Sequence, residues 1–287
     1  MNYLLAVSGG VDSMVLLDYF CANPKIAKEN ITVAHFNHGT RPSADTDEAF
    51  AKAKAQEYGV AFISKKLFLG EGVSESDARE ARYDFLKFEA TRRNATLTTA
   101  HHLNDLTESI LINLTRGTGW RGLTPMYNAP TSTYNIYRPF LELRWTKADI
   151  LKYAAAHNIT FREDPTNSED NYLRNRIREQ LRQASQKNTA SLQDLSYRQS
   201  VLRQEIEEIA TQLISDKTIN RAWFQTLDDS TALELLYIYL KQNGISATTP
   251  QLKNFLEAIR TYTPGKLFNL PKNHLIKIEK TCFYLKK

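Results

Sequence analysis

Short apolar runs and amphipathic segments alternate through the first half of the chain. Four runs rich in apolar and β-branched residues predict strands, at Tyr3–Val7, Ile31–Phe36, Val60–Ile63 and Ala95–Ala100. The segments between them space apolar residues three and four apart, which predicts helices, at Asp12–Phe20, Ala44–Tyr58, Ser74–Arg92 and Leu106–Leu114. This repetition favours an α/β fold with a doubly wound, mostly parallel sheet that is covered by helices on both faces.

The pattern changes from about Asn171 onward. Long polar segments with helical periodicity follow, at Tyr172–Gln183, Ser191–Leu213, Thr231–Gln242 and Pro250–Tyr262. The final stretch, Lys266–Leu285, alternates apolar and polar residues around a Pro-Lys-Asn sequence, which predicts a terminal hairpin. We therefore expect a catalytic domain over residues 1–187 and a smaller helical domain over residues 188–287, joined by a soft polar link near residues 185–190.

Composition narrows the class of protein. With 42% hydrophobic and 24% charged residues, the 287-residue chain has enough apolar area for packed domains, so disorder is not expected. The two cysteines, Cys21 and Cys282, stand far apart, which argues against a disulfide framework or a Cys-rich zinc site and favours a reducing, cytoplasmic compartment. The first apolar run is too short for a signal peptide or a membrane span, so we expect no membrane partner. A net charge of +5 permits an anionic partner without identifying one.

A glycine pair directly after the first predicted strand is the most informative feature of the chain. The segment Ser8–Ser13 lies between that strand and the first predicted helix. Two glycines let the backbone turn sharply and approach a ligand closely. A helix that starts near Asp12 directs unpaired N–H groups into the same space, and the hydroxyls of Ser8 and Ser13 add donors. This arrangement predicts an anion cradle, and the alternative is an ordinary Gly-Gly turn with a capping side chain.

The loop differs from the Walker phosphate loop because no lysine follows its second glycine. A carboxylate, Asp12, occupies the loop instead. A bare carboxylate beside phosphates would be repulsive, so we expect a divalent cation held by Asp12 to bridge the two.

Histidines mark the end of the second predicted strand. His35 and His38 lie where open α/β sheets place their ligands. Because neither cysteine nor a further histidine is near in sequence, zinc binding is the weaker interpretation. The remaining interpretations are a nucleotide-facing edge and a turn, with Gly39 at positive φ and a capped Asn37.

Charged pairs with helical spacing follow on later segments. Arg79 and Arg82 are three residues apart on one predicted helix face, which is either a solvated face or a ligand-binding one. Asp105 and Glu108 are also three apart, next to the end of the fourth predicted strand. Two carboxylates there suit an ammonium group whose proton must be removed. Capping of a helix N-terminus would explain either acid alone.

In combination, these segments resemble the tRNA(Ile)-lysidine synthetase family, within the PP-loop superfamily of N-type ATP pyrophosphatases. The Ser8–Ser13 loop matches the SGGxDS sequence of the superfamily. Further blocks follow in the order of the family, at His35–Arg41, Ala78–Tyr83, His101–Ser109, Arg116–Leu123, Arg138–Leu141 and Arg174–Arg178, the last preceded by Asp164 and Asn167. The resemblance covers about the first 180 residues. Asn104, Leu106 and Ser109 depart from the family pattern, whereas the two acids are retained.

The resemblance implies a reaction in two steps, with ATP and Mg²⁺ as cofactors. The C2 oxygen of the wobble cytidine, in a tRNA(Ile) with a CAU anticodon, would attack the α-phosphate of ATP, and pyrophosphate would leave into the loop. The side-chain amine of free lysine would then attack C2, release AMP and form lysidine. Catalytic roles would fall to Asp105, Glu108 and Arg82. The nucleotide site would comprise Ser8, Gly9, Gly10, Val11, Asp12, Ser13, His35 and Arg174, with Asp12 holding the magnesium.

The second half carries a separate indication of RNA binding. Seven basic residues and two acids lie between Arg174 and Arg203, which suits an RNA backbone, although a solvated helix face explains the same charges. The rival functions are a PP-loop tRNA thiolase, which usually relies on cysteines or a cluster, and a non-catalytic tRNA-binding protein on the same fold. Larger family members carry a further C-terminal domain, and we expect this chain to end before it. The oligomeric state is left open, with a homodimer as one option.

Overall fold

The structure is a computed structural model that describes residues 1–39, 44–67, 75–128, 136–162, 172–183 and 186–286. Side chains are described within these ranges, apart from those of residues 75–76, 172–174, 182–183 and 186–188. Two compact units are present, one formed by residues 1–128 and 132–199 and the other chiefly by residues 200–287. Among the described residues, the helices lack the combination of length and apolar character that crossing a bilayer requires.

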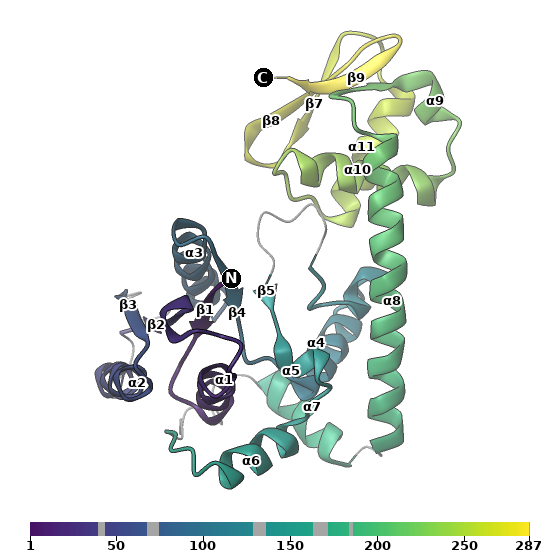
Figure 1. Ribbon diagram of the computed structural model, residues 1–287. Helices are drawn as coiled ribbons and strands as arrows, with labels where there is room; N and C mark the ends of the chain where they lie inside the picture. Colours follow the sequence, from purple (N-terminus) through teal and green to yellow (C-terminus); the bar gives the residue numbers. More distant parts are fainter. Residues whose placement is uncertain (40–43, 68–74, 129–135, 163–171, 184–185, 287) are drawn as a thin grey trace. The chain divides into compact units, whose positions relative to one another are not determined.

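A five-stranded sheet forms the centre of the first unit (Figure 1). Its strands are β1 (Asn2–Ala6), β2 (Ile31–Asn37), β3 (Ala61–Lys66), β4 (Ala95–Thr98) and β5 (Ile136–Tyr137). All neighbouring strands are parallel, and their order is β3-β2-β1-β4-β5. The predicted α/β fold is therefore confirmed. The additional strand, β5, was not expected because two residues are too few to show a strand periodicity.

Helices connect the strands and follow them. They are α1 (Val11–Cys21), α2 (Ala44–Tyr58), α3 (Glu75–Arg92), α4 (Leu103–Thr115), α5 (Pro139–Glu142), α6 (Lys147–Ala156), α7 (Tyr172–Gln183) and α8 (Gln186–Leu213), with short 3₁₀ turns at Lys28–Asn30 and Trp120–Leu123. The helix α4 begins three residues before its predicted start, because the carboxylate of Asp105 accepts a hydrogen bond from the backbone N–H of His102, the N-cap residue, at 3.0 Å. Both acids of the predicted site thus lie in the first two turns of α4.

Apolar residues cover both faces of the sheet. On one face, Leu5 and Val33 belong to a buried cluster with side chains of α1, α2 and α6. On the other face, Leu4 and Ala34 are buried with side chains of α3. The chain adds β2 and β3 on one side of β1 and then crosses back to place β4 on the other side. Such a reversal of strand order leaves a crevice at the carboxyl ends of the strands, where ligands bind in open α/β sheets.

The second unit is a helical layer on an antiparallel sheet. Its helices are α9 (Arg221–Gln225), α10 (Asp229–Gln242) and α11 (Thr249–Thr261), and its strands are β6 (Thr218–Asn220), β7 (Lys266–Leu270), β8 (His274–Ile278) and β9 (Cys282–Lys286), in the order β6-β9-β8-β7. The predicted terminal hairpin is confirmed as β7 and β8, whose turn includes the Pro271–Asn273 segment. The sheet is wider than predicted, since β9 pairs with both β8 and β6.

The helix α8 spans the region that the sequence suggested as a link. The backbone of residues 186–190 is helical, so the link that the sequence predicted belongs to a helix. The two compact units separate within α8, between residues 199 and 200. The assignment of catalysis to one part of the chain and of tRNA contact to the other stays a prediction.

Candidate active site

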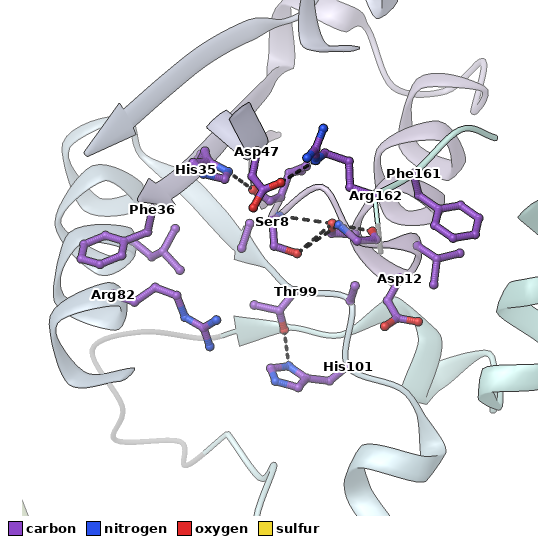
Figure 2. Close-up of a pocket in the computed structure, with 18 of the residues that line it drawn as sticks. Ser8, Asp12, His35, Phe36, Asp47, Arg82, Thr99, His101, Phe161 and Arg162 are labelled. Atoms are coloured by element: carbon purple, nitrogen blue, oxygen red, sulfur yellow. Dashed lines mark hydrogen bonds and ion pairs between the residues drawn. The ribbon is translucent and has the colours of Figure 1, made fainter. Parts of the chain in front are cut away.

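A cavity of about 1000 Å³ lies at the carboxyl ends of β1, β2 and β4. It brings together side chains that are far apart in the sequence, as Figure 2 shows for Asp12, His35, Arg82 and His101. The predicted site residues that line it are Ser8, Gly10, Val11, Asp12, Ser13, His35, Arg82 and Asp105. The cavity is large enough for a nucleotide, since small-molecule sites range from about 300 to 1,000 Å³.

The loop between β1 and α1 is organised by one hydroxyl group. The Oγ of Ser13 accepts hydrogen bonds from the N–H groups of Ser8 and Gly9, both at 3.2 Å, and donates to the carbonyl of Gly10 at 2.9 Å. Gly9 has a φ of +97°, which a side chain would strain. Ser13 is only 5% exposed. The hydroxyl expected to contact a ligand therefore holds the loop in shape from within.

The N-terminus of α1 opens into the cavity without a side-chain cap. Gly10 is the N-cap residue in an extended conformation, and no described side chain hydrogen-bonds to the first turn. The amides of the first helical residues have no partner inside the helix itself, and the helix dipole places partial positive charge there. The first turn, from Val11 to Ser13, thus fits an anion such as a phosphate.

Charged side chains from three elements meet beside this turn. The carboxylate Oδ1 of Asp12 lies 2.6 Å from Nζ of Lys147 on α6. The Nε2 atom of His102 lies 3.8 Å from the same oxygen and 3.4 Å from Oδ2 of Asp105. His102 therefore stands between the acid of the loop and the first acid of α4, so the two predicted parts of the site are contiguous.

The donor set suits a magnesium ion that is shared with phosphate. Mg²⁺ typically takes one or two carboxylates, substrate phosphates and several waters rather than a full set of protein ligands. Asp12 projects from the first turn of α1, where a bound phosphate would lie. Within the described part of the chain, no group of three or more His, Cys, Asp or Glu residues is placed to hold a metal ion. Asp12 thus fits a bridging cation and not a protein-only metal centre.

The histidine segment at the end of β2 continues into the turn that was one of the interpretations. Gly39 has a φ of +64°, and its N–H donates to Oδ1 of Asn37 at 2.9 Å. His35 is 4% exposed, and burial lowers the pKa of its imidazole. Its Nδ1 lies 2.9 Å from the carbonyl oxygen of Val7, so Nδ1 carries the proton. His35 lines the cavity as a neutral side chain.

Guanidinium groups surround His101, which follows β4 and lines the cavity together with Arg82 of α3. Burial lowers the pKa of His101 to about 3, with further lowering by the guanidinium groups of Arg138, Arg79 and Arg82. The Oγ1 of Thr99 lies 2.7 Å from its Nδ1. His101 is therefore neutral at physiological pH, and the arginines around it favour an anionic ligand.

Glu108 occupies a different position from Asp105. It is not among the residues that line the cavity, its exposure is 6%, and its Oε1 accepts a hydrogen bond from Nε of Arg178 at 2.8 Å. Arg174 lies on α7, but its side chain falls outside the described residues, as do Asp164 and Asn167. Gly9 also lies outside the lining, although its carbonyl accepts a hydrogen bond from the N–H of Arg162 at 3.0 Å.

The cavity contains charged residues that sequence reasoning did not identify. Lys147 contacts Asp12, and Nε of Arg162 lies 2.5 Å from Oδ1 of Asp47 on α2. All three of Lys147, Arg162 and Asp47 line the cavity. No local pattern distinguishes them, because each lies in an ordinary polar context and reaches the site only through the packing of α2 and α6 around the loop.

The fold and the cavity define a nucleotide-binding domain that presents an uncapped helix N-terminus at the switch point of a parallel sheet. Residues 1–185 match the family model described as a PP-loop domain, and the chain belongs to this family. Membership implies ATP as a cofactor, as expected.

Curated relatives extend the similarity into the second unit. The chain is 32% identical to a tRNA(Ile)-lysidine synthase of Streptococcus mutans over 297 residues, covering 100% of this chain and 64% of the relative. It is 31% identical over 296 residues to a bifunctional protein TilS/HprT of Listeria innocua, covering 94% of this chain and 45% of the relative. The chain thus spans about half to two thirds of the length of these relatives.

A solved structure shares the fold. The U34-tRNA thiolase NcsA of Methanococcus maripaludis superposes with a TM-score of 0.57, at 19% identity, over 70% of this chain and 72% of the thiolase. At this identity the likeness concerns the fold alone.

Proposed function

We propose that this chain ligates free lysine to C2 of the wobble cytidine in a tRNA(Ile) with a CAU anticodon, through an adenylated cytidine. ATP supplies the adenylyl group, and pyrophosphate and then AMP are released. The observation that carries the proposal is the continuity of one cavity from the uncapped first turn of α1 to Asp105. The similarity to tRNA(Ile)-lysidine synthases along the whole chain supports this choice of substrates.

The first step uses the loop and the cation held by Asp12. The amides of Val11 to Ser13 bind the leaving pyrophosphate, while Ser13 keeps the loop in shape. Mg²⁺, when bound at Asp12, neutralises charge that develops on the phosphates. Arg82 faces the cavity beside the neutral His101 and stabilises the adenylate. These groups are in place before the reaction, which is the condition for strong electrostatic stabilisation of a transition state.

The second step requires a lysine amine without its extra proton. The amine has an ordinary pKa of about 10.4, so it enters as an ammonium ion. Asp105 faces the cavity and binds this ion, and it accepts the proton as the amine attacks C2. Glu108 lies one helical turn away, outside the cavity lining, where its bond to Arg178 joins α4 to α7. We therefore assign lysine orientation to both acids and proton acceptance to Asp105.

The tRNA contact is proposed for residues 188–287 and for the basic stretch between Arg174 and Arg203. Lysines and arginines in excess over acids bind an RNA backbone by neutralising phosphates. Filter binding of tRNA at increasing salt concentrations tests this proposal. Replacing one basic residue that contacts a phosphate should lower the slope of log affinity against log salt concentration by about one. Light scattering with and without tRNA tests the homodimer option.

The direct test incubates the chain with labelled lysine, ATP and a transcript bearing the CAU anticodon. We expect label in the RNA, pyrophosphate release that requires tRNA and continues beyond one turnover only when lysine is present, and loss of both with Asp12→Ala. Asp105→Asn and Glu108→Gln should raise the KM for lysine more than the KM for ATP. A transcript with a different wobble base is the matched control, and equal labelling of both transcripts would sink the assignment of the substrate.

The rival functions give different outcomes in the same assay. A thiolase would transfer sulfur rather than lysine and usually relies on cysteines or a cluster. The chain has two cysteines, of which Cys21 lies on α1 and has its pKa raised to about 11 by burial, and Cys282 lies in the second unit. Neither lines the cavity. A non-catalytic tRNA-binding protein would bind the transcript without releasing pyrophosphate.

A further inference from the structure

Lys147 places an ammonium group beside the phosphate loop from an element that is remote in sequence. Its Nζ lies 2.6 Å from Oδ1 of Asp12, across 135 positions of the chain. Both side chains line the cavity, and they are 40% and 35% exposed. The ammonium therefore occupies the place on the carboxylate that a bridging cation would take, and it has open space on its cavity side.

The backbone of Lys147 is held by several independent contacts. Thr146 caps α6, because its N–H donates to Oδ2 of Asp149 at 2.8 Å and its Oγ1 accepts from the N–H of Asp149 at 3.4 Å. The N–H of Lys147 donates to Oδ1 of Asn104 at 2.9 Å. The N–H of Leu103 donates to the carbonyl of Trp145 at 2.9 Å. The last two bonds join the N-termini of α6 and α4, and together with the cap they fix the backbone position of Lys147.

Asn104 thereby gains a structural explanation. It is one of the positions at which the sequence departs from the pattern of the family it resembles. Its side-chain oxygen accepts from the backbone amide that begins α6. It acts on the site through Lys147 rather than by facing the ligand, since it is not part of the cavity lining.

We infer that Lys147 is the phosphate-binding lysine of this site, exchanging its bond to Asp12 for the terminal phosphates of ATP and then for pyrophosphate. This inference rests on the proposed function. The Ser8–Ser13 loop lacks the lysine that a Walker loop carries at its end. The packing of α6 against α1 supplies an equivalent ammonium from outside the loop.

The ammonium of Lys147 has two competing partners, the carboxylate of Asp12 and the phosphates of ATP. A pair between side chains this exposed contributes little to stability, so the bond to Asp12 is easily exchanged. A triphosphate carries several negative charges, and Mg²⁺ on Asp12 would displace a positive group from the same oxygen. Lysine suits this exchange because its ammonium sits on a long flexible stem and binds as a point charge.

The test measures binding, independently of turnover, on the whole chain. Calorimetry with Mg·ATP, Mg·pyrophosphate and adenosine compares the wild type with Lys147→Met and Lys147→Gln. We expect both variants to bind Mg·ATP and Mg·pyrophosphate about 10- to 100-fold more weakly, with adenosine affinity changed less than about twofold. Lys147→Arg should recover part of the loss. Lys152→Met, an exposed lysine on the same helix, is the matched control and should behave as the wild type.

A second comparison separates phosphate binding from simple neutralisation of Asp12. If Lys147 served only Asp12, adding Lys147→Met to Asp12→Asn would leave Mg·pyrophosphate affinity unchanged, and the inference would be wrong. We expect a further loss of at least fivefold in the double variant. Folded Lys147→Met with wild-type Mg·ATP affinity would also overturn the inference. If the wild type binds neither Mg·ATP nor Mg·pyrophosphate, the proposed function is wrong as well. If only the inference about Lys147 is wrong, the wild type still binds both ligands.

Discussion

The carboxylate of Glu108 on α4 accepts a hydrogen bond from Nε of Arg178 on α7 at 2.8 Å. The acid is nearly buried, with its side chain 8% exposed, whereas the guanidinium is 38% exposed. Burial of a carboxylate is unfavourable unless positive charge and hydrogen bonds compensate for it. The pair therefore links α7, which carries the late arginine block of the sequence, to the helix that carries both candidate lysine-binding acids.

Arg178→Met should destabilise the first unit through this carboxylate. Removing the guanidinium leaves negative charge in a nearly buried position, and we expect a loss of about 2 kcal/mol in the free energy of unfolding, less than for a fully buried pair because Arg178 is partly solvated. Urea denaturation measures it. Adding Glu108→Gln to Arg178→Met should recover part of the loss, and a double variant less stable than Arg178→Met would contradict the explanation.

Ser13→Ala should affect both stability and nucleotide binding. The substitution leaves the N–H groups of Ser8 and Gly9 without the Oγ acceptor, and Gly9 is buried. We expect a loss of about 1–3 kcal/mol in the free energy of unfolding and weaker Mg·ATP binding, because the loop loses its shape. Ser8→Ala is the comparison for stability only: that side chain is exposed and makes longer contacts, at 3.4 Å to the N–H of Gly10 and 3.3 Å to Oγ of Ser13, so its loss should cost less than about 0.5 kcal/mol. Equal losses for the two variants would argue against this role for Ser13.

Acidification should destabilise the first unit through His101. Its pKa in the folded chain is about 3, below the ordinary value of about 6.5. Between these values the unfolded chain binds more protons than the folded chain, so the free energy of unfolding falls as the pH falls. For this residue the loss between pH 6.5 and pH 5 is roughly 1–2 kcal/mol. Urea denaturation of His101→Gln between pH 6.5 and pH 5 should show a weaker dependence of the free energy of unfolding on pH. A dependence identical to that of the wild type would show that His101 is not the responsible group.

Arg221→Met should destabilise the second unit. Arg221 is 6% exposed and donates to the carbonyls of Ile259, Tyr262 and Glu279 at 2.7, 2.6 and 3.1 Å. Without the guanidinium these acceptors lose charged donors, and we expect a loss of about 2–3 kcal/mol. Arg260→Met is the control, because Arg260 pairs with an exposed carboxylate, Asp229, and such pairs contribute about 1 kcal/mol or less. The midpoint of thermal unfolding should be clearly lower for Arg221→Met than for Arg260→Met. Similar midpoints would contradict a stabilising role for the buried guanidinium of Arg221.

Hydrophobic periodicity was sufficient to predict the class of the fold. It located β1, β2 and β4 to within a residue or two at each end, because buried strands in a parallel sheet read as apolar runs. It did not predict β5, whose two residues are held by pairing with β4. The helical start of α8 was also missed, since a polar helix surface and a polar link have the same composition.

Some features of the candidate site could likewise be predicted from the sequence, and others could not. By itself the sequence determined the turn at Ser8–Ser13, since glycines between a strand and a helix favour a local turn and an open helix N-terminus; its binding of phosphate stays a prediction. It also determined that Asp105 and Glu108 share one helix, because their spacing is local. Only the tertiary structure decided that Asp105 faces the cavity while Glu108 pairs with Arg178, and that Lys147 reaches Asp12. These relationships join residues that are 70 and 135 positions apart, and such contacts depend on how whole helices pack, which no local pattern encodes.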